Sequence, residues 1–175
     1  MLRLLTDRRV GTKIMLAVLL VTAFSVIDGL LALTSLGTIN QQVKTGYRHN
    51  QELNTVASLR SAVNRTWLAA SDYLLAPDAA TRNTADQAMT TGSDQVEQYA
   101  DELQTFPLTS ASRTALATFQ EQWTGYLTAW QEEVKPRATQ NRSALQAART
   151  QALTPAMNAV RTPLTELADL TVQES

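Results

Sequence analysis

Two arginines on one predicted helix are the side chains of this chain best suited to binding chemistry. In the stretch "SLRSAVNRTWLAASDY", Arg60 falls between Val56 and Val63, on the heptad stripe that is expected to face a core. A charged side chain is costly at such a position unless it has a partner. Arginine suits carboxylates because its planar guanidinium donates two parallel hydrogen bonds. The position of Arg60 therefore indicates a binding site for a small carboxylate.

Arg65 follows Arg60 by five residues, which turn an α-helix by about 500°. The two side chains then point about 140° apart, so they cannot hold one anion from a single helix face. Across a dimer interface, Arg60 and Arg65 could instead contribute from two subunits. The alternative is that both arginines form only surface salt bridges, for example between Arg65 and Asp72.

Other kinds of site chemistry find little support in the composition. The chain has no cysteine and one histidine, His49, which argues against disulfides, thiolate metal sites and a Ser-His-Asp site. No Glu-x-x-His pair is present to hold a di-iron centre. The near-neutral net charge of −1 gives no nucleic-acid footprint. We therefore expect a protein that is not an enzyme, with no cofactor, no metal and no nucleic-acid partner.

One apolar run is long enough to cross a membrane. Residues 14–36 carry a single charge, Asp28, and a bilayer core of about 30 Å needs about 20 helical residues. The net charge is +3 over residues 1–13 and −4 over the rest of the chain, which predicts a cytoplasmic N-terminus. A cleaved signal peptide would look similar, but the run continues without a turn into a helical pattern. The sequence favours an uncleaved membrane helix, with everything after it outside the cytoplasm.

The remainder of the chain shows helical periodicity in four segments. The breakers between them are "APDAA", "FPLTS" and "VKPRATQNRS", and helices joined by short loops fold back on one another. We therefore expect an all-α fold, in which the membrane helix runs into an antiparallel up-down-up-down four-helix bundle. The predicted divisions are a cytoplasmic N-terminus (1–13), a transmembrane helix (14–36) and a periplasmic sensor bundle (37–175).

Each of the four segments carries an apolar stripe that is expected to face the core. The third stripe consists of Leu116, Phe119, Trp123, Tyr126, Trp130 and Val134. The fourth consists of Leu145, Ala148, Ala152, Ala156, Val160, Leu164, Leu167 and Leu170. Pro155 and Pro163 interrupt the fourth segment, and each removes a backbone donor, so kinks are expected there.

This order of elements resembles the N-terminal input region of bacterial methyl-accepting chemotaxis receptors. "RRVGTKIMLAVLL" looks like their basic start and first membrane helix, and "LTPAMNAVRTPLTELADL" looks like their fourth sensor helix. The resemblance implies an inner-membrane receptor whose periplasmic bundle forms a homodimer and binds a small molecule. It also implies a second membrane helix, a HAMP linker and a signalling coiled coil beyond this piece, which would reach a cytoplasmic kinase and a coupling protein.

Within that family, the aspartate-receptor type of sensor is the most similar. Its first-helix arginines and a fourth-helix threonine hold a dicarboxylate between subunits, which implies Arg60, Arg65 and Thr154 as ligand-binding residues. A third arginine of that pattern would fall at Ala69 and is absent. The implied ligand is an organic acid or an amino acid. The input domain of a membrane histidine kinase or cyclase, or a non-sensing membrane-anchored scaffold, remains the alternative.

Overall fold

The computed structural model describes residues 43–44, 46–139 and 142–173. The predicted N-terminus (1–13) and membrane helix (14–36) lie outside the described residues. Within the described part, no helix is both long and apolar enough to cross a membrane. Residues His49–Ser175 form a compact unit of their own, and this unit is the bundle described below.

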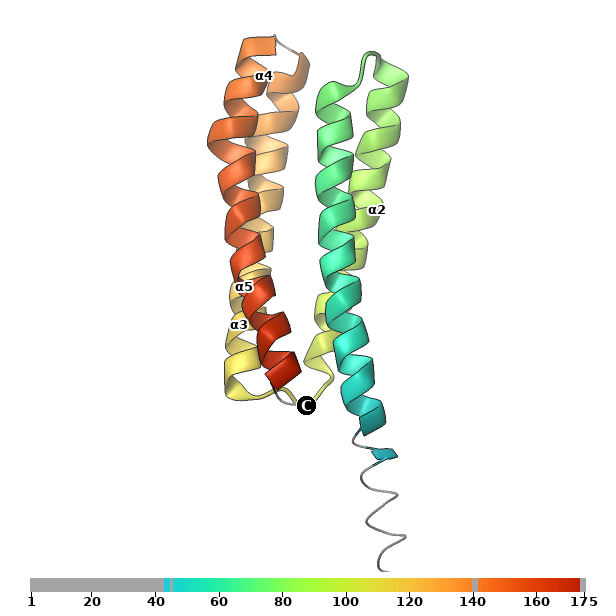
Figure 1. Cartoon of the computed structure of the whole chain (residues 1–175). Helices are drawn as coiled ribbons and strands as arrows, with labels where there is room; N and C mark the ends of the chain where they lie inside the picture. Colours follow the sequence, from blue (N-terminus) through green and yellow to red (C-terminus); the bar gives the residue numbers. More distant parts are fainter. Residues whose placement is uncertain (1–42, 45, 140–141, 174–175) are drawn as a thin grey trace, which may run out of the picture. The chain divides into compact units, whose positions relative to one another are not determined.

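The bundle has four helical arms, which alternate in direction along the chain (Figure 1). The first arm is residues 49–75 of the helix that spans residues 46–75. The other elements are α2 (Ala79–Gln104), α3 (Ser110–Thr128), η1 (Ala129–Val134), η2 (Lys135–Thr139), α4 (Arg142–Ala148), η3 (Arg149–Leu153) and α5 (Thr154–Gln173). α3, η1 and η2 make up the third arm, and α4, η3 and α5 the fourth. The all-α, up-down-up-down prediction is confirmed for the described residues, none of which lies in a strand.

The first two turns between the arms form where the breakers "APDAA" and "FPLTS" predicted them, whereas residues 140–141 of the third breaker lie outside the described residues. Asp78, next to Pro77, caps α2 because its carboxylate accepts a hydrogen bond from the Thr81 N–H over 2.7 Å. Thr109 caps α3 in the same way, by accepting from the Ser112 N–H over 3.2 Å. These caps satisfy backbone donors that the first turn of a helix leaves unpaired.

The aromatic stripe of the third arm forms the centre of the core, as predicted. Phe119, Trp123, Tyr126 and Trp130 are all buried. The ring of Trp123 stacks on Tyr126 with 5.2 Å between centroids. Trp130 meets the ring of Tyr73, from the first arm, edge-on at 5.1 Å. Aromatic burial of this extent contributes strongly to the stability of a bundle of this size.

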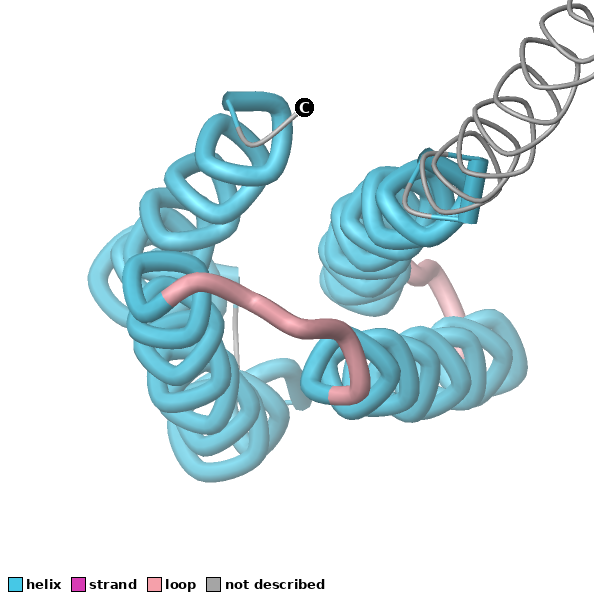
Figure 2. The backbone as a smooth tube through the Cα atoms, turned by 90° about the horizontal axis from the view of Figure 1, so that it is seen from below, coloured by secondary structure: helices cyan, strands magenta, loops and turns pink. Residues whose placement is uncertain are grey.

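The arms are arranged as two pairs, the first arm with α2 and α3 with α5 (Figure 2). Gly92 of α2 faces Thr66 of the first arm, whose buried hydroxyl donates to the Ala62 carbonyl oxygen over 2.9 Å. A Cβ atom on Gly92 would collide with that hydroxyl. Glycine therefore interrupts the apolar stripe of α2 because the two helices approach closely there.

The fourth arm departs from the predicted core by one residue. Leu153 and Met157 are buried, whereas the predicted Ala152 and Ala156 are only partly buried. The cause is η3, a π-helical stretch that lies between Ala148, which is buried, and the next core residue. A π turn bonds residue i to i+5 and so holds one more residue than an α turn. The sequence predicts kinks at both prolines of the fourth segment. At Pro155 the helix instead forms a π turn just before the proline, and at Pro163 helix α5 continues through the proline.

Candidate functional site

A hollow of about 260 Å³ lies between the first arm and α5. It is lined by Arg60, Val63, Asn64, Arg161, Leu164 and Thr165. Val63 and Leu164 are only 1% and 3% exposed, so they form an apolar floor. The four polar residues are exposed at its rim.

Both walls of the hollow follow the same helical pattern. On the first arm, Arg60 is followed by an apolar residue at the third position and by Asn64 at the fourth. On α5, Arg161 is followed by an apolar residue at the third position and by Thr165 at the fourth. Residues at these spacings share one face of a helix. Each helix therefore presents one guanidinium and one neutral polar side chain beside the same apolar floor.

The Arg161 side chain also contacts an aromatic ring of the first arm. Its guanidinium carbon lies 5.8 Å from the ring centroid of Trp67, a partly buried residue of the first arm. At this distance the positive charge is attracted to the face of the indole ring. The contact joins the two walls of the hollow and restricts the positions of the Arg161 side chain.

Arg60, one of the predicted site residues, lines the hollow but does not face the core. The core position is taken by Leu59, which is fully buried between Val56 and Val63, whereas Arg60 is exposed. The buried stripe advances by three and then four residues, so it passes one residue before Arg60. The prediction of a core-facing Arg60 is therefore wrong, and its charge is not buried within the bundle.

Arg65 and Thr154 are not brought together with Arg60 in one subunit. Arg65 is exposed and does not line the hollow. Thr154 is partly buried at the start of α5. It lies seven residues before Arg161, or about 10 Å along the helix. Their predicted role in ligand binding between two subunits stays a prediction.

Arg161, Asn64 and Thr165 were not identified from the sequence. A usable signal was present, because "RSAVN" and "RTPLT" carry the same order of arginine, apolar and polar residues. That signal acquires meaning only when the first and fourth arms are known to lie side by side.

The lining groups have the chemistry to bind an anion. Two guanidinium groups, an amide and a hydroxyl can all donate hydrogen bonds, and guanidinium groups pair strongly with carboxylates. The lining contains no acid or base that could take up a proton near neutral pH. Across the described part of the chain, no group of three His, Cys, Asp or Glu residues is placed to hold a metal ion.

Comparison with known proteins agrees with this architecture. Residues 7–175 match a protein family described as a four-helix-bundle sensory module for signal transduction. No curated protein and no solved structure matches the chain significantly. Because the family match covers nearly the whole chain and the described residues form the corresponding bundle, the chain belongs to the family of four-helix-bundle sensory modules for signal transduction.

Proposed function

We propose that this sensory module is the periplasmic ligand-binding domain of a chemotaxis-type receptor in the bacterial inner membrane. The family designation refers to methyl-accepting chemotaxis proteins, which supports this output over a kinase or a cyclase. The apolar run at residues 14–36, with its basic flank, supports the membrane anchor and the cytoplasmic N-terminus. The full receptor would pass the signal to a cytoplasmic kinase and its coupling protein.

The ligand of the module is a small carboxylate, an organic acid or an amino acid, bound in the hollow. The observation that carries this proposal is that two arginines from different arms, Arg60 and Arg161, line one small hollow with an apolar floor. Two positive charges near a low-dielectric surface repel each other, and an anion between them offsets that repulsion. Asn64 and Thr165 supply donors for the second polar end of the ligand.

The module acts as a homodimer through the outer face of its first arm. Leu68 and Leu75 are 60% and 72% exposed, and residues seven apart lie on the same helix face. Exposed leucines at heptad spacing are typical of a seam between helices. Arg65 precedes Leu68 by three residues and so borders this seam. A ligand site shared between the two subunits, with Arg65 as one of its residues, therefore remains part of the proposal.

Signalling would proceed by a small shift of α5. A ligand in the hollow contacts the first arm through Arg60 and α5 through Arg161, so its binding free energy depends on how these two helices lie against each other. A ligand that prefers one arrangement shifts the population toward it. In the full receptor, the shift would be transmitted along the fourth arm toward the second membrane helix.

A thermal-shift screen of organic acids and amino acids on the full chain in detergent tests the ligand proposal. A bound acid at about 100 times its dissociation constant adds about 2.7 kcal/mol, which raises the melting temperature by several degrees. Arg60→Ala and Arg161→Ala should abolish the rise. Arg149→Ala, which removes an exposed arginine elsewhere on the fourth arm, should retain it.

The other outcomes separate the alternatives. If an acid binds and only Arg65→Ala abolishes the rise, the site lies between subunits and not in the hollow. If no organic acid or amino acid raises the melting temperature, the carboxylate proposal is wrong and the scaffold alternative gains support.

A further inference from the structure

The two π segments of the bundle end in the same way. η1 ends at Val134 and is followed by Lys135 and Pro136, and η3 ends at Leu153 and is followed by Thr154 and Pro155. The N–H of the residue before each proline donates across a π turn, from Lys135 to the Trp130 carbonyl and from Thr154 to the Arg149 carbonyl. In both "VKP" and "LTP", a π turn thus ends immediately before the residue that precedes the proline.

Proline explains why the turn before it is wide. A proline inside a helix has no N–H, and its ring clashes with the carbonyl group four residues earlier. A turn closed by i→i−5 hydrogen bonds gives that carbonyl more room and holds one residue more than an α turn. Each π segment therefore contains one spare residue, which a continuous α-helix could dispense with.

The two π segments lie side by side. η1 and η3 contact each other, and α4, which leads directly into η3, also contacts η1 at the same end of the bundle (Figure 1). A change in the helical register of one segment would therefore alter its packing against the other. No such segment occurs in the first arm or in α2, which are α-helical throughout their described lengths.

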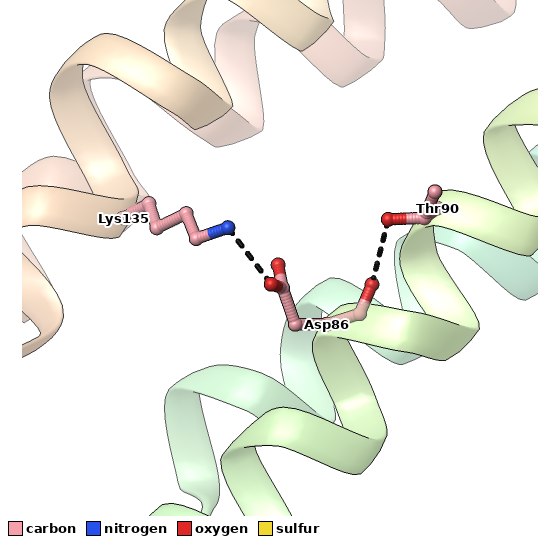
Figure 3. A network of polar contacts seen from close by, with 3 residues as sticks. All are labelled: Asp86, Thr90 and Lys135. Atoms are coloured by element: carbon pink, nitrogen blue, oxygen red, sulfur yellow. Dashed lines mark hydrogen bonds and ion pairs between the residues drawn. The ribbon is translucent and has the colours of Figure 1, made fainter.

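The two segments differ in how firmly they are held. η1 buries Trp130 and Val134. The residue that follows it, Lys135, pairs with Asp86 of α2 over 2.8 Å (Figure 3). η3 buries only Leu153, while Arg149, Thr150 and Gln151 are exposed. Local rearrangement is easiest where few apolar side chains are buried, so η3 is the segment that can change.

We propose that η3 is a register joint, at which the spare residue lets α5 move relative to α4 and η1 without unfolding. Moving that residue along the fourth arm would displace α5 by up to about 1.5 Å, the rise of one residue. η1 stays in place because Trp130 is buried and Lys135 pairs with Asp86. This inference rests on backbone geometry and burial, and it holds whatever ligand the hollow binds.

Single-residue deletions test whether η3 really holds a spare residue. Both deletions are made in the Pro155→Ala background, so that no proline opposes an α turn. Deleting Gln151 shortens the step from Ala148 to Leu153 from five positions to four, so the downstream core residues keep their positions on a continuous α-helix. Deleting Thr162, an exposed residue of α5, turns every later residue by about 100° and takes Leu164 and Leu167 out of the core.

The full chain without Gln151 should melt within about 3 °C of its Pro155→Ala parent. The chain without Thr162 should melt at least about 10 °C lower or fail to fold. If the two deletions are equally damaging, η3 holds no spare residue and the proposal is overturned.

Amide hydrogen exchange of the full chain tests whether the joint opens. Residues 149–154 should exchange at least about tenfold faster than residues 83–90 of α2, which lie near the same end of the bundle. Deleting Gln151 in the Pro155→Ala background should slow exchange over the shortened segment toward the rate of α2, and Pro155→Ala alone should not. Equal protection of the two regions in the wild-type chain would show that η3 is rigid and would overturn the proposal.

Discussion

In the first pair of helices, the first arm and α2, the described backbone is α-helical throughout, whereas the second pair, α3–η1 and η3–α5, contains two π segments. The first pair is fixed by close approach at Gly92 and Thr66. The second pair buries larger side chains, led by Trp130 and Tyr126. One pair thus gains its stability from tight backbone packing and the other from aromatic volume around a less regular backbone.

The hollow lies between these two kinds of structure. Arg60 belongs to the regular pair, and Arg161 belongs to α5, which follows the π turn of η3. A bound anion would therefore connect a fixed wall to an adjustable one. If the wall that follows η3 is the more adjustable one, a ligand between the two helices would shift α5 rather than the first arm.

The largest expected effect tests the aromatic core of the second pair. Trp130→Ala should lower the free energy of unfolding by about 3–5 kcal/mol, since the side chain is fully buried and leaves a cavity. Trp67→Ala should cost less, because Trp67 is only partly buried. Urea denaturation measures both. If Trp130→Ala costs less than Trp67→Ala, the aromatic volume is not what stabilises the second pair.

The next effect tests the close approach in the first pair. Gly92→Ala should destabilise the bundle by about 1–3 kcal/mol, because its methyl group meets the Thr66 hydroxyl. Gly125→Ala is the matched control, since a Cβ atom there meets nothing within 4 Å. It should stabilise the chain by about 0.5–1 kcal/mol. Adding Thr66→Ala to Gly92→Ala should recover much of the loss, and equal effects of the two glycine substitutions would contradict close packing.

A smaller effect, in the opposite direction, concerns Tyr126 in the second pair. Its hydroxyl oxygen is buried and has no hydrogen-bond partner among the described residues, and such a group costs free energy on folding. Tyr126→Phe should therefore stabilise the chain by about 1 kcal/mol, with Tyr99→Phe as a half-buried control. Loss of stability in Tyr126→Phe would mean that the hydroxyl is satisfied in solution.

Tyr126 also predicts a dependence on alkaline pH. Burial raises the pKa of Tyr126 above its ordinary value of 10.0, so above that pH the unfolded chain ionises while the folded chain does not. Stability should fall as the pH rises through that range. The fall should be less steep in Tyr126→Phe.

The smallest effect concerns the cap of α2. The hydrogen bond from the Thr81 N–H lowers the pKa of Asp78 below its ordinary value of 3.8. The stabilising contribution of the ionised cap is therefore complete above that value and is lost as the pH falls through the lowered pKa. Asp78→Asn keeps a capping oxygen without the charge, so the wild-type melting temperature should fall more steeply than that of Asp78→Asn between pH 5 and about pH 2. Parallel curves would exclude this role.

The sequence predicted the helical fold because the evidence for it is local. Apolar periodicity and the breakers at Pro77 and Pro107 are enough to place the ends of helices. The one-residue displacement from Ala152 to Leu153 could not be read in this way, because the periodicity count assumed 3.6 residues per turn throughout. Pro155 predicts an interruption of the helix, but a proline can produce a kink, the end of a helix or a π turn, and the sequence does not distinguish these outcomes.

The site was harder to predict, for two physical reasons. Arg60 was placed at the core position that Leu59 occupies, because the seven-residue step from Val56 to Val63 can be divided into steps of four and three or of three and four, and heptad counting does not distinguish the two. Arg161 could be recognised only from the pairing of the first and fourth arms, which is a tertiary contact. Arg60 does line the hollow, and its proposed role in binding an anion comes from residue chemistry rather than from its exact orientation.

The most direct test of the account is hydrogen exchange of the full chain in detergent with and without succinate, malate and each amino acid. We predict that at least one of these acids gives saturable protection in two places, the first arm around Arg60 and the stretch from η3 to Arg161. α2 should be unchanged, and the protection should be lost in Arg161→Ala. Protection confined to α2, or no saturable protection by any of these acids, would contradict the claim that a carboxylate joins the fixed first arm to an adjustable α5.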